Sequence, residues 1–160
     1  MTTRVSDEDA DEAMAATLSW LGQHALRPLA RIWATVELER ALADLGADPA
    51  AAAAALDDPL LGARVVVLAA ADGGPDIALA EPSTEGRLAL TLARHGEGPA
   101  GQYLAVAIGL ESVAARADLA EARISRPAVG PFGWSVLIQD QSNRGWNLIL
   151  VGPAAVPSRP

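Results

Sequence analysis

The stretch EPSTEGRLALTLARHGEGPAGQY, residues 81–103, decides how this chain folds. It follows an apolar run, carries a short helical pattern in LALTLARH, and ends in a glycine-rich turn that leads into a second apolar run at Gln102. Proline interrupts regular structure because it lacks an N–H group, and glycine reaches backbone angles that turns require. The stretch is therefore expected to join two halves of the chain.

The sequence of the first half predicts one helix and three strands. A strand is expected at 29–36 and a helix at 37–46, where leucines recur on one face. Two more strands are expected at 63–71 and 75–82, because Asp-Gly between two apolar runs is a hairpin signal. The alanine-rich segment 47–59 is ambiguous: its composition favours helix or loop, whereas the repeat described below requires a strand near it.

The second half predicts the same order of elements. A strand is expected at 102–108, a helix at 110–122 and a short irregular strand at 124–129. Two apolar runs at 133–140 and 146–152, separated by a polar turn, predict the closing hairpin. The chain therefore contains two similar β-α-β-β-β patterns.

A constant shift relates the two halves. Moving along the chain by 71 residues takes Arg31 to Gln102 and Ala78 to Ile149, so the first and last strands of each half keep the same separation. A duplicated βαβββ unit explains this spacing. We therefore expect an α+β fold made of two paired βαβββ modules.

The chain is most simply one domain with an extension at each end. At 160 residues it can bury one sizeable core. Met14, Leu18 and Leu21 recur at the spacing of an amphipathic helix ahead of the first strand. The expected organisation is an N-terminal helical extension (1–28), a domain (29–152) with modules 29–82 and 102–152 and a linker (83–101), and a flexible tail (153–160).

Composition excludes several classes of partner. The formal charge of −8 argues against nucleic acids and anionic membranes, which attract clustered positive charge. The chain has no Cys, which excludes disulfides, thiol nucleophiles and thiolate metal sites and fits a cytoplasmic protein. The acidic N-terminal segment lacks a signal-peptide core, and no run reaches the roughly 18 apolar residues of a membrane span. We expect a soluble, cytoplasmic protein.

Three segments resemble, in order, the vicinal oxygen chelate (glyoxalase-like) superfamily and in particular its methylmalonyl-CoA epimerases. They are IALAEP, RLALTLARHGEGP and GPFGWSVLIQDQSNRGWNLILV. The resemblance covers roughly 29–152 and implies that the paired modules form a half-barrel sheet, often within a homodimer. It also implies chemistry at a divalent metal held by one ligand from each of four strands, typically His, Gln or Glu, His, and Glu.

The resemblance puts these four ligand positions at Arg31, Ala78, Gln102 and Ile149. Only Gln102 has an atom that could coordinate a metal, because Arg is permanently charged and Ala and Ile have no donor atom. The flanking residues offer no substitute, since all are apolar: Ala30, Ile32, Ile77, Leu79, Leu148 and Leu150. We therefore expect neither a metal nor another cofactor.

Strand alternation predicts which side chains replace the metal. The expected catalytic residues are Arg31, which would stabilise negative charge developing on a carbonyl oxygen, and Asp76, which would move a proton. An ion pair between the two would instead be structural. The expected ligand-binding residues are Trp33, Thr35, Gln102, Leu104, Asn147 and Ile149. Gln102 and Asn147 could equally be hydrogen-bond fillers, and Trp33 a core residue.

Two further acids remain open at this point. Asp57 and Asp58 lie where the superfamily often has an acidic base, although solvation in a loop explains them equally well. The favoured function is a metal-independent isomerase, cyclase or lyase acting on a small organic acid, carbonyl or acyl thioester in an apolar sheet cavity. The alternatives are a non-catalytic small-molecule-binding or drug-sequestering protein of the same fold, and a structural partner subunit.

Overall fold

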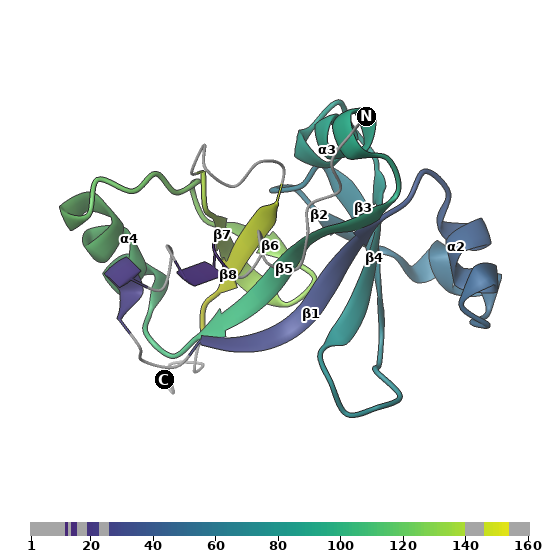
Figure 1. The fold of residues 1–160 in the computed structure, drawn as a ribbon, viewed down its shortest axis with the longest axis horizontal. Coiled ribbons are helices and arrows are strands. Elements are labelled where there is room, and N and C mark those ends of the chain that lie inside the picture. The colour runs from purple at the N-terminus through teal and green to yellow at the C-terminus, as the bar shows by residue number, and fades with distance from the viewer. Residues whose placement is uncertain (1–11, 13, 16–18, 23–25, 140–145, 154–160) are drawn as a thin grey trace, which may run out of the picture.

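The computed structural model describes residues 12, 14–15, 19–22, 26–139 and 146–153. Figure 1 shows a single curved sheet with helices at its two sides. The strands are β1 (Leu26–Ala34), β2 (Leu56–Asp58), β3 (Ala63–Leu68), β4 (Asp76–Pro82), β5 (Gly98–Val106), β6 (Ala128–Gly130), β7 (Gly133–Leu137) and β8 (Asn147–Val151). The helices are α2 (Leu38–Asp44), the 3-10 helix η1 (Pro49–Ala54), α3 (Arg87–His95) and α4 (Leu110–Leu119).

The sheet consists of two modules that lie side by side. The strand order is β2-β3-β4-β1-β5-β8-β7-β6, so β1 and β5 meet in the centre as antiparallel neighbours. Within each module the first and last strands run parallel. The shift of 71 residues converts the β1–β4 register pair Ala30–Asp76 into the β5–β8 pair Gly101–Asn147. The paired βαβββ modules expected from the sequence are therefore confirmed.

The sheet curls until its two outer strands meet. β2 and β6 are in contact, and a Cβ atom added to Gly130 would lie 3.5 Å from the Asp58 carboxyl carbon. Small side chains such as Ala30 and Ala78 line the concave face and allow this tight curvature. The result is a nearly closed half-barrel whose interior is packed by apolar residues from both modules.

The helices cover the convex face and one end of the interior. On α2, Leu38, Ala41 and Leu42 recur at helical spacing and pack with the first module. Val113 and Ala117 are the buried residues of α4, and Val113 packs on the second module. The linker helix α3 contacts β1, β4 and β5 and inserts Leu88 into the concave core. Figure 1 shows α2 and α4 at opposite sides of the molecule, with α3 between them.

Two carboxylates, one just before the linker and one near its end, bind backbone N–H groups at the start of α2. The Glu81 carboxylate accepts the N–H of Leu38 at 2.7 Å, and the Glu97 carboxylate accepts the N–H of Val36 at 2.9 Å. The helix has no hydrogen-bonded side-chain cap at its own N-cap residue, Glu37. Residues that flank α3 therefore satisfy N–H groups that a helix start leaves without a partner.

Several element boundaries differ from the expected ones. β1 begins at Leu26, three residues before the expected start, because the strand continues through Pro28. The alanine-rich segment resolves into both alternatives: η1 is helical, and the short strand β2 follows it. Much of the expected N-terminal helix, including His24, and the expected tail beyond 153 lie outside the described residues. Leu21 is described, packs with the core near α4, and accepts a hydrogen bond from Arg116 at 3.1 Å.

None of the helices in the described part of the chain combines the length and apolar character that crossing a membrane requires.

Candidate functional site

A tyrosine and an aspartate span the centre of the interior. The Tyr103 hydroxyl on β5 donates to Asp58 Oδ2 on β2 at 2.5 Å. Asp58 Oδ1 accepts the N–H groups of Leu60 at 2.9 Å and Leu61 at 3.3 Å. Asp58 is only 2% exposed and Tyr103 only 1%. The expectation that Asp58 is solvated in a loop is therefore wrong.

Burial changes the acidity of both groups. Desolvation raises the pKa of the Asp58 carboxyl, although hydrogen bonds from Tyr103 and two N–H groups oppose the rise. The pKa of Tyr103 lies well above its usual value, chiefly because the ring is buried and secondly because Asp58 is close. A buried carboxylate with a raised pKa is typical of functional sites, and structural hydrogen-bond networks also produce it.

The centre of the interior does not fit the metal that the resemblance implies. Ala78 and Ile149, two of the four expected ligand positions, face this interior, are completely buried and have no donor atom. The Tyr103 side chain belongs to the same packed cluster. In the described ranges there is no group of three or more His, Cys, Asp or Glu residues that could hold a metal ion.

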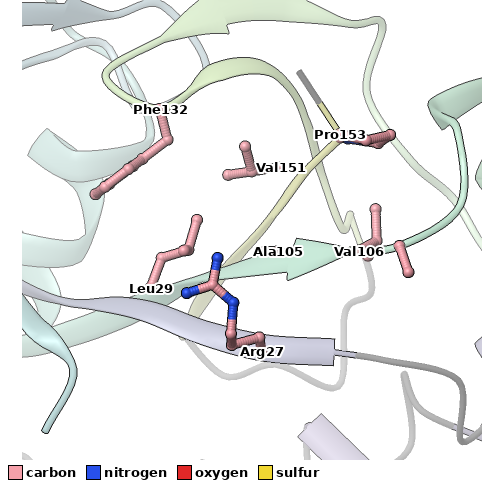
Figure 2. A pocket seen from close by; sticks show the side chains of 9 residues that line it. Arg27, Leu29, Ala105, Val106, Phe132, Val151 and Pro153 are labelled. Atoms are coloured by element: carbon pink, nitrogen blue, oxygen red, sulfur yellow. The ribbon is translucent and has the colours of Figure 1, made fainter. Parts of the chain in front are cut away.

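A cavity of about 490 Å³ lies beyond this centre, where β1 begins and β5 and β8 end. It is mostly apolar, and Arg27 is the one charged residue among the described residues that line it. Figure 2 shows the Arg27 guanidinium next to Leu29, with the Phe132 ring across the space from them. The lining residues are Arg27, Leu29, Ala105, Val106, Ala107, Phe132, Val151, Gly152 and Pro153.

Phe132 connects the cavity to the Tyr103–Asp58 pair. Its ring lines the cavity and also packs on the Tyr103 ring, with centroids 5.0 Å apart and planes tilted by 56°. Tyr103 lies two residues before the cavity residue Ala105 on β5, so both point to the concave side. The Phe132 ring therefore contacts both the ligand-sized space and the Tyr103 ring, whose hydroxyl bonds the buried acid.

A second polar cluster lies at the other end of the interior, near α3. Arg87 Nε donates to Asn147 Oδ1 at 2.8 Å, and Asn147 Nδ2 donates to the carbonyl oxygen of Ala100 at 2.9 Å and to Thr91 Oγ1 at 3.2 Å. Desolvation lowers the pKa of Arg87. Arg87 forms no ion pair within the described residues. The cluster fixes the first residue of α3 to the first residue of β8.

Four of the expected site residues lie on the convex face, not in the interior. Arg31 and Gln102 pair across the β1–β5 junction, and Arg31 is exposed. Trp33 is 41% exposed, so the expectation that it packs in the core or lines a trough is wrong. Leu104 is buried in the cluster beneath α4. The assumed alternation was shifted by one residue on β1 and β5, which sends every side chain of a strand to the other face.

Three other expected residues, Asp76, Asn147 and Ile149, lie at concave-side positions of their strands but apart from one another. Asp76 accepts the N–H of Ala70 at 3.2 Å and closes the β3–β4 turn, and it forms no ion pair with Arg31. Asn147 belongs to the Arg87 cluster, and Ile149 is packed in the core. Thr35 is buried and donates to Glu97 at 2.9 Å.

Sequence reasoning missed the residues that shape the cavity. The expected boundaries place Arg27 at the end of the helical extension, Leu29 at the start of a strand, and Phe132 between two expected strands. One signal was present for Arg87: a cation in the first turn of a helix opposes the helix dipole and therefore needs a local reason. No comparable signal marks Phe132, whose role depends on how far the sheet curls.

No protein-family model and no curated relative matches the chain. Among solved structures, a variant of Streptomyces coelicolor methylmalonyl-CoA epimerase in complex with 2-nitronate-propionyl-CoA is 22% identical, with 82% of this chain and 99% of that chain covered and a TM-score of 0.62. Methylmalonyl-CoA epimerase from Mycobacterium tuberculosis is 18% identical, with coverages of 83% and 92% and a TM-score of 0.63. The hypothetical protein BH1468 from Bacillus halodurans C-125 is 16% identical, with coverages of 85% and 100% and a TM-score of 0.62. These similarities show that the chain has the vicinal oxygen chelate fold.

Proposed function

On this vicinal oxygen chelate scaffold, we propose that the protein binds a small organic molecule in the cavity beside Phe132, without a metal held by its own side chains. The observation that carries the proposal is the cavity itself, which is about 490 Å³ in volume and whose described lining is apolar apart from the guanidinium of Arg27. Ligand sites in proteins have this size and this mixture of a mostly apolar wall with few polar groups.

The chemistry of the side chains that face the interior supports the proposed metal independence. A hard divalent cation needs several oxygen or nitrogen ligands, and the positions in question hold Ala78 and Ile149. The Tyr103 ring also fills the space between β5 and β2. The proposal therefore assigns binding to shape, apolar contact and Arg27.

Ligand binding after metal removal tests the proposal. Protein treated with a chelator should bind small organic fragments in saturation-transfer NMR as well as untreated protein does. Ala105→Leu, which fills part of the cavity, should weaken binding, whereas Gln102→Leu on the convex face should not. Loss of binding on metal removal, or equal binding by both variants, would refute the proposal.

A second candidate function is an isomerase or lyase activity on the bound molecule, and the Tyr103–Asp58 pair favours it. The described lining of the cavity contains no carboxylate or imidazole that could exchange a proton. Asp58 is connected to the cavity through two rings: it accepts the hydrogen bond of Tyr103, and the Tyr103 ring packs on Phe132, which lines the cavity. The epimerases among the structural neighbours make an acyl thioester a reasonable substrate to assay.

Binding and turnover can be separated by substitution. If the chain is an enzyme, Asp58→Asn should abolish turnover of an acyl thioester while the affinity for it is retained. Arg31→Ala serves as the control, because Arg31 lies on the convex face and we assign it no role in the cavity. Turnover that survives Asp58→Asn would exclude Asp58 as the proton-transfer group.

The homodimer and the cytoplasmic location expected from the sequence remain part of the proposal. Sedimentation equilibrium of the purified chain would test the dimer.

A further inference from the structure

We infer that the cavity selects a monoanionic carboxylate with an apolar body about the size of one or two rings, and that Arg27 binds the carboxylate. This inference rests on the proposed function and narrows its ligand. Three observations support it: a β-bulge that redirects Arg27, the absence of a competing ion pair within the described residues, and the apolar character of the remaining wall.

The bulge determines which face Arg27 occupies. On β1, Arg31 points to the convex side, and strict alternation would send Arg27 to the same side. The β1–β5 register shifts between Pro28 and Ala30, where two steps along β1 oppose one step along β5. Leu29 is thus an extra residue, and such bulges commonly redirect a side chain near a site. Arg27 is turned to the concave side.

The position of Arg27 after the bulge agrees with this account. Arg27 is in register with Ala105, and Ala105 is in register with Val151; all three line the cavity. Figure 2 shows the guanidinium directed into the space bounded by Leu29 and Phe132. Arg27 is exposed, so its guanidinium is accessible to a ligand that enters from solvent.

Arg27 has no ion-pair partner among the described residues. Arg40 and Arg64 pair with Glu97 and Glu81, whereas Arg27 forms no ion pair within the described ranges. The chain carries a net charge of −8, so anions are repelled except near such an isolated cation. A guanidinium offers parallel N–H groups that match the two oxygens of a carboxylate.

The rest of the wall limits the ligand. Among the described residues, no second cation lines the cavity, which disfavours polyanions because their further charges would have no partner. Leu29, Val151 and Phe132 offer apolar contact, and the Phe132 ring can stack on a flat ligand. A volume of about 490 Å³ accommodates a ring system and leaves the carboxylate at the rim.

A matched pair of probes tests the inference on the full chain. Naphthaleneacetate and its neutral analogue naphthaleneacetamide share shape and apolar area, and their affinities can be measured by calorimetry or by NMR titration. We expect the carboxylate to bind roughly tenfold more tightly than the amide, as a charge-assisted pair exceeds a neutral hydrogen bond. Arg27→Gln should remove this preference and leave amide binding unchanged.

Arg31→Gln is the control, since Arg31 is also exposed on β1 but points to the other face. It should keep the full preference for the carboxylate. Equal affinity of the wild-type protein for both probes would overturn the inference while leaving the proposed function intact. A preference that persists in Arg27→Gln, with unchanged thermal unfolding, would overturn the role of Arg27. Binding of neither probe, nor of any fragment in the chelator experiment, would overturn the proposed function itself.

Discussion

Tyr103 and Asp58 form a hydrogen bond across the interior that joins the central strand β5 to the edge strand β2. The hydroxyl and the carboxylate lie 45 residues apart in the chain and are both almost fully buried. Because the bond lies across the curl of the sheet, it holds the half-barrel closed on the concave side, where Ala78 and Ile149, two of the four expected ligand positions, also lie.

Tyr103→Phe should destabilise the fold, because Asp58 would stay buried with one hydrogen bond fewer. The expected loss is about 1–3 kcal/mol, the usual cost of leaving a buried hydrogen-bond acceptor, here Asp58 Oδ2, without a partner. Urea unfolding at neutral pH measures it. The exposed residue Trp134 provides a control, since Trp134→Phe should change the free energy of unfolding by less than about 0.5 kcal/mol. Equal effects of the two substitutions would contradict the structural role of the bond.

Asp58 should make the protein less stable as pH rises. Burial raises its folded pKa above the ordinary value of 3.8, so the folded state holds the proton more tightly than the unfolded state. Stability therefore falls as pH rises from about that value through the folded pKa, and is constant above it. The difference in unfolding free energy between wild type and Asp58→Asn, measured from pH 3 to 8, should show this slope. A difference that is flat with pH would refute the raised pKa.

Glu97 should act in the opposite direction. The N–H of Val36, the Arg40 guanidinium and the Thr35 hydroxyl lower the pKa of Glu97 to about 2 from 4.5. Its contribution to stability is present above pH 4.5 and disappears as pH falls through about 2. Glu97→Gln should therefore lower the unfolding midpoint at neutral pH and have little effect near pH 2. An equal effect at both pH values would show that the charge of Glu97 is irrelevant.

Gly101→Ala should be far more damaging than Gly46→Ala. A Cβ on Gly101 would lie 2.1 Å from the backbone oxygen of Asn147 on β8, and a hydrogen-bonded strand cannot move aside for it. Gly46 has a positive φ of 74° but open space around it, so alanine there costs only the backbone strain of about 1 kcal/mol. Circular dichroism melting of both variants gives the comparison. Similar melting temperatures would indicate that β5 and β8 separate more easily than their pairing implies.

The fold was predictable because it depends on local patterns and on one internal repeat. The linker and the shift of 71 residues led to the two βαβββ modules, and in the structure the first and last strands of each module pair, β1 with β4 and β5 with β8. The prediction of which side chains face the interior was wrong for β1 and β5. On β1 the sequence contained the evidence, because Arg31 alternates with the apolar residues Ala30 and Ile32, which indicates a solvent side for Arg31 and a buried side for its neighbours.

The cavity could not have been predicted in the same way. The bulge at Leu29 depends on the register between β1 and β5, which only the assembled sheet specifies. The meeting of Asp58 with Tyr103 depends on the contact between β2 and β6, strands of three residues each whose sequences carry almost no signal. The site therefore depends on contacts between strands that are distant in the sequence, whereas the fold could be predicted from local sequence patterns and the internal repeat.

The two carboxylates at the ends of the linker have a consequence for how the protein is made. Because Glu97 as well as Glu81 holds the start of α2, the first module is complete only once residue 97 has left the ribosome. A gene fragment that ends at 82 would encode all the strands of that module and still leave its helix without the second carboxylate. The two halves are therefore not equivalent, because a carboxylate from the segment that joins them completes the first.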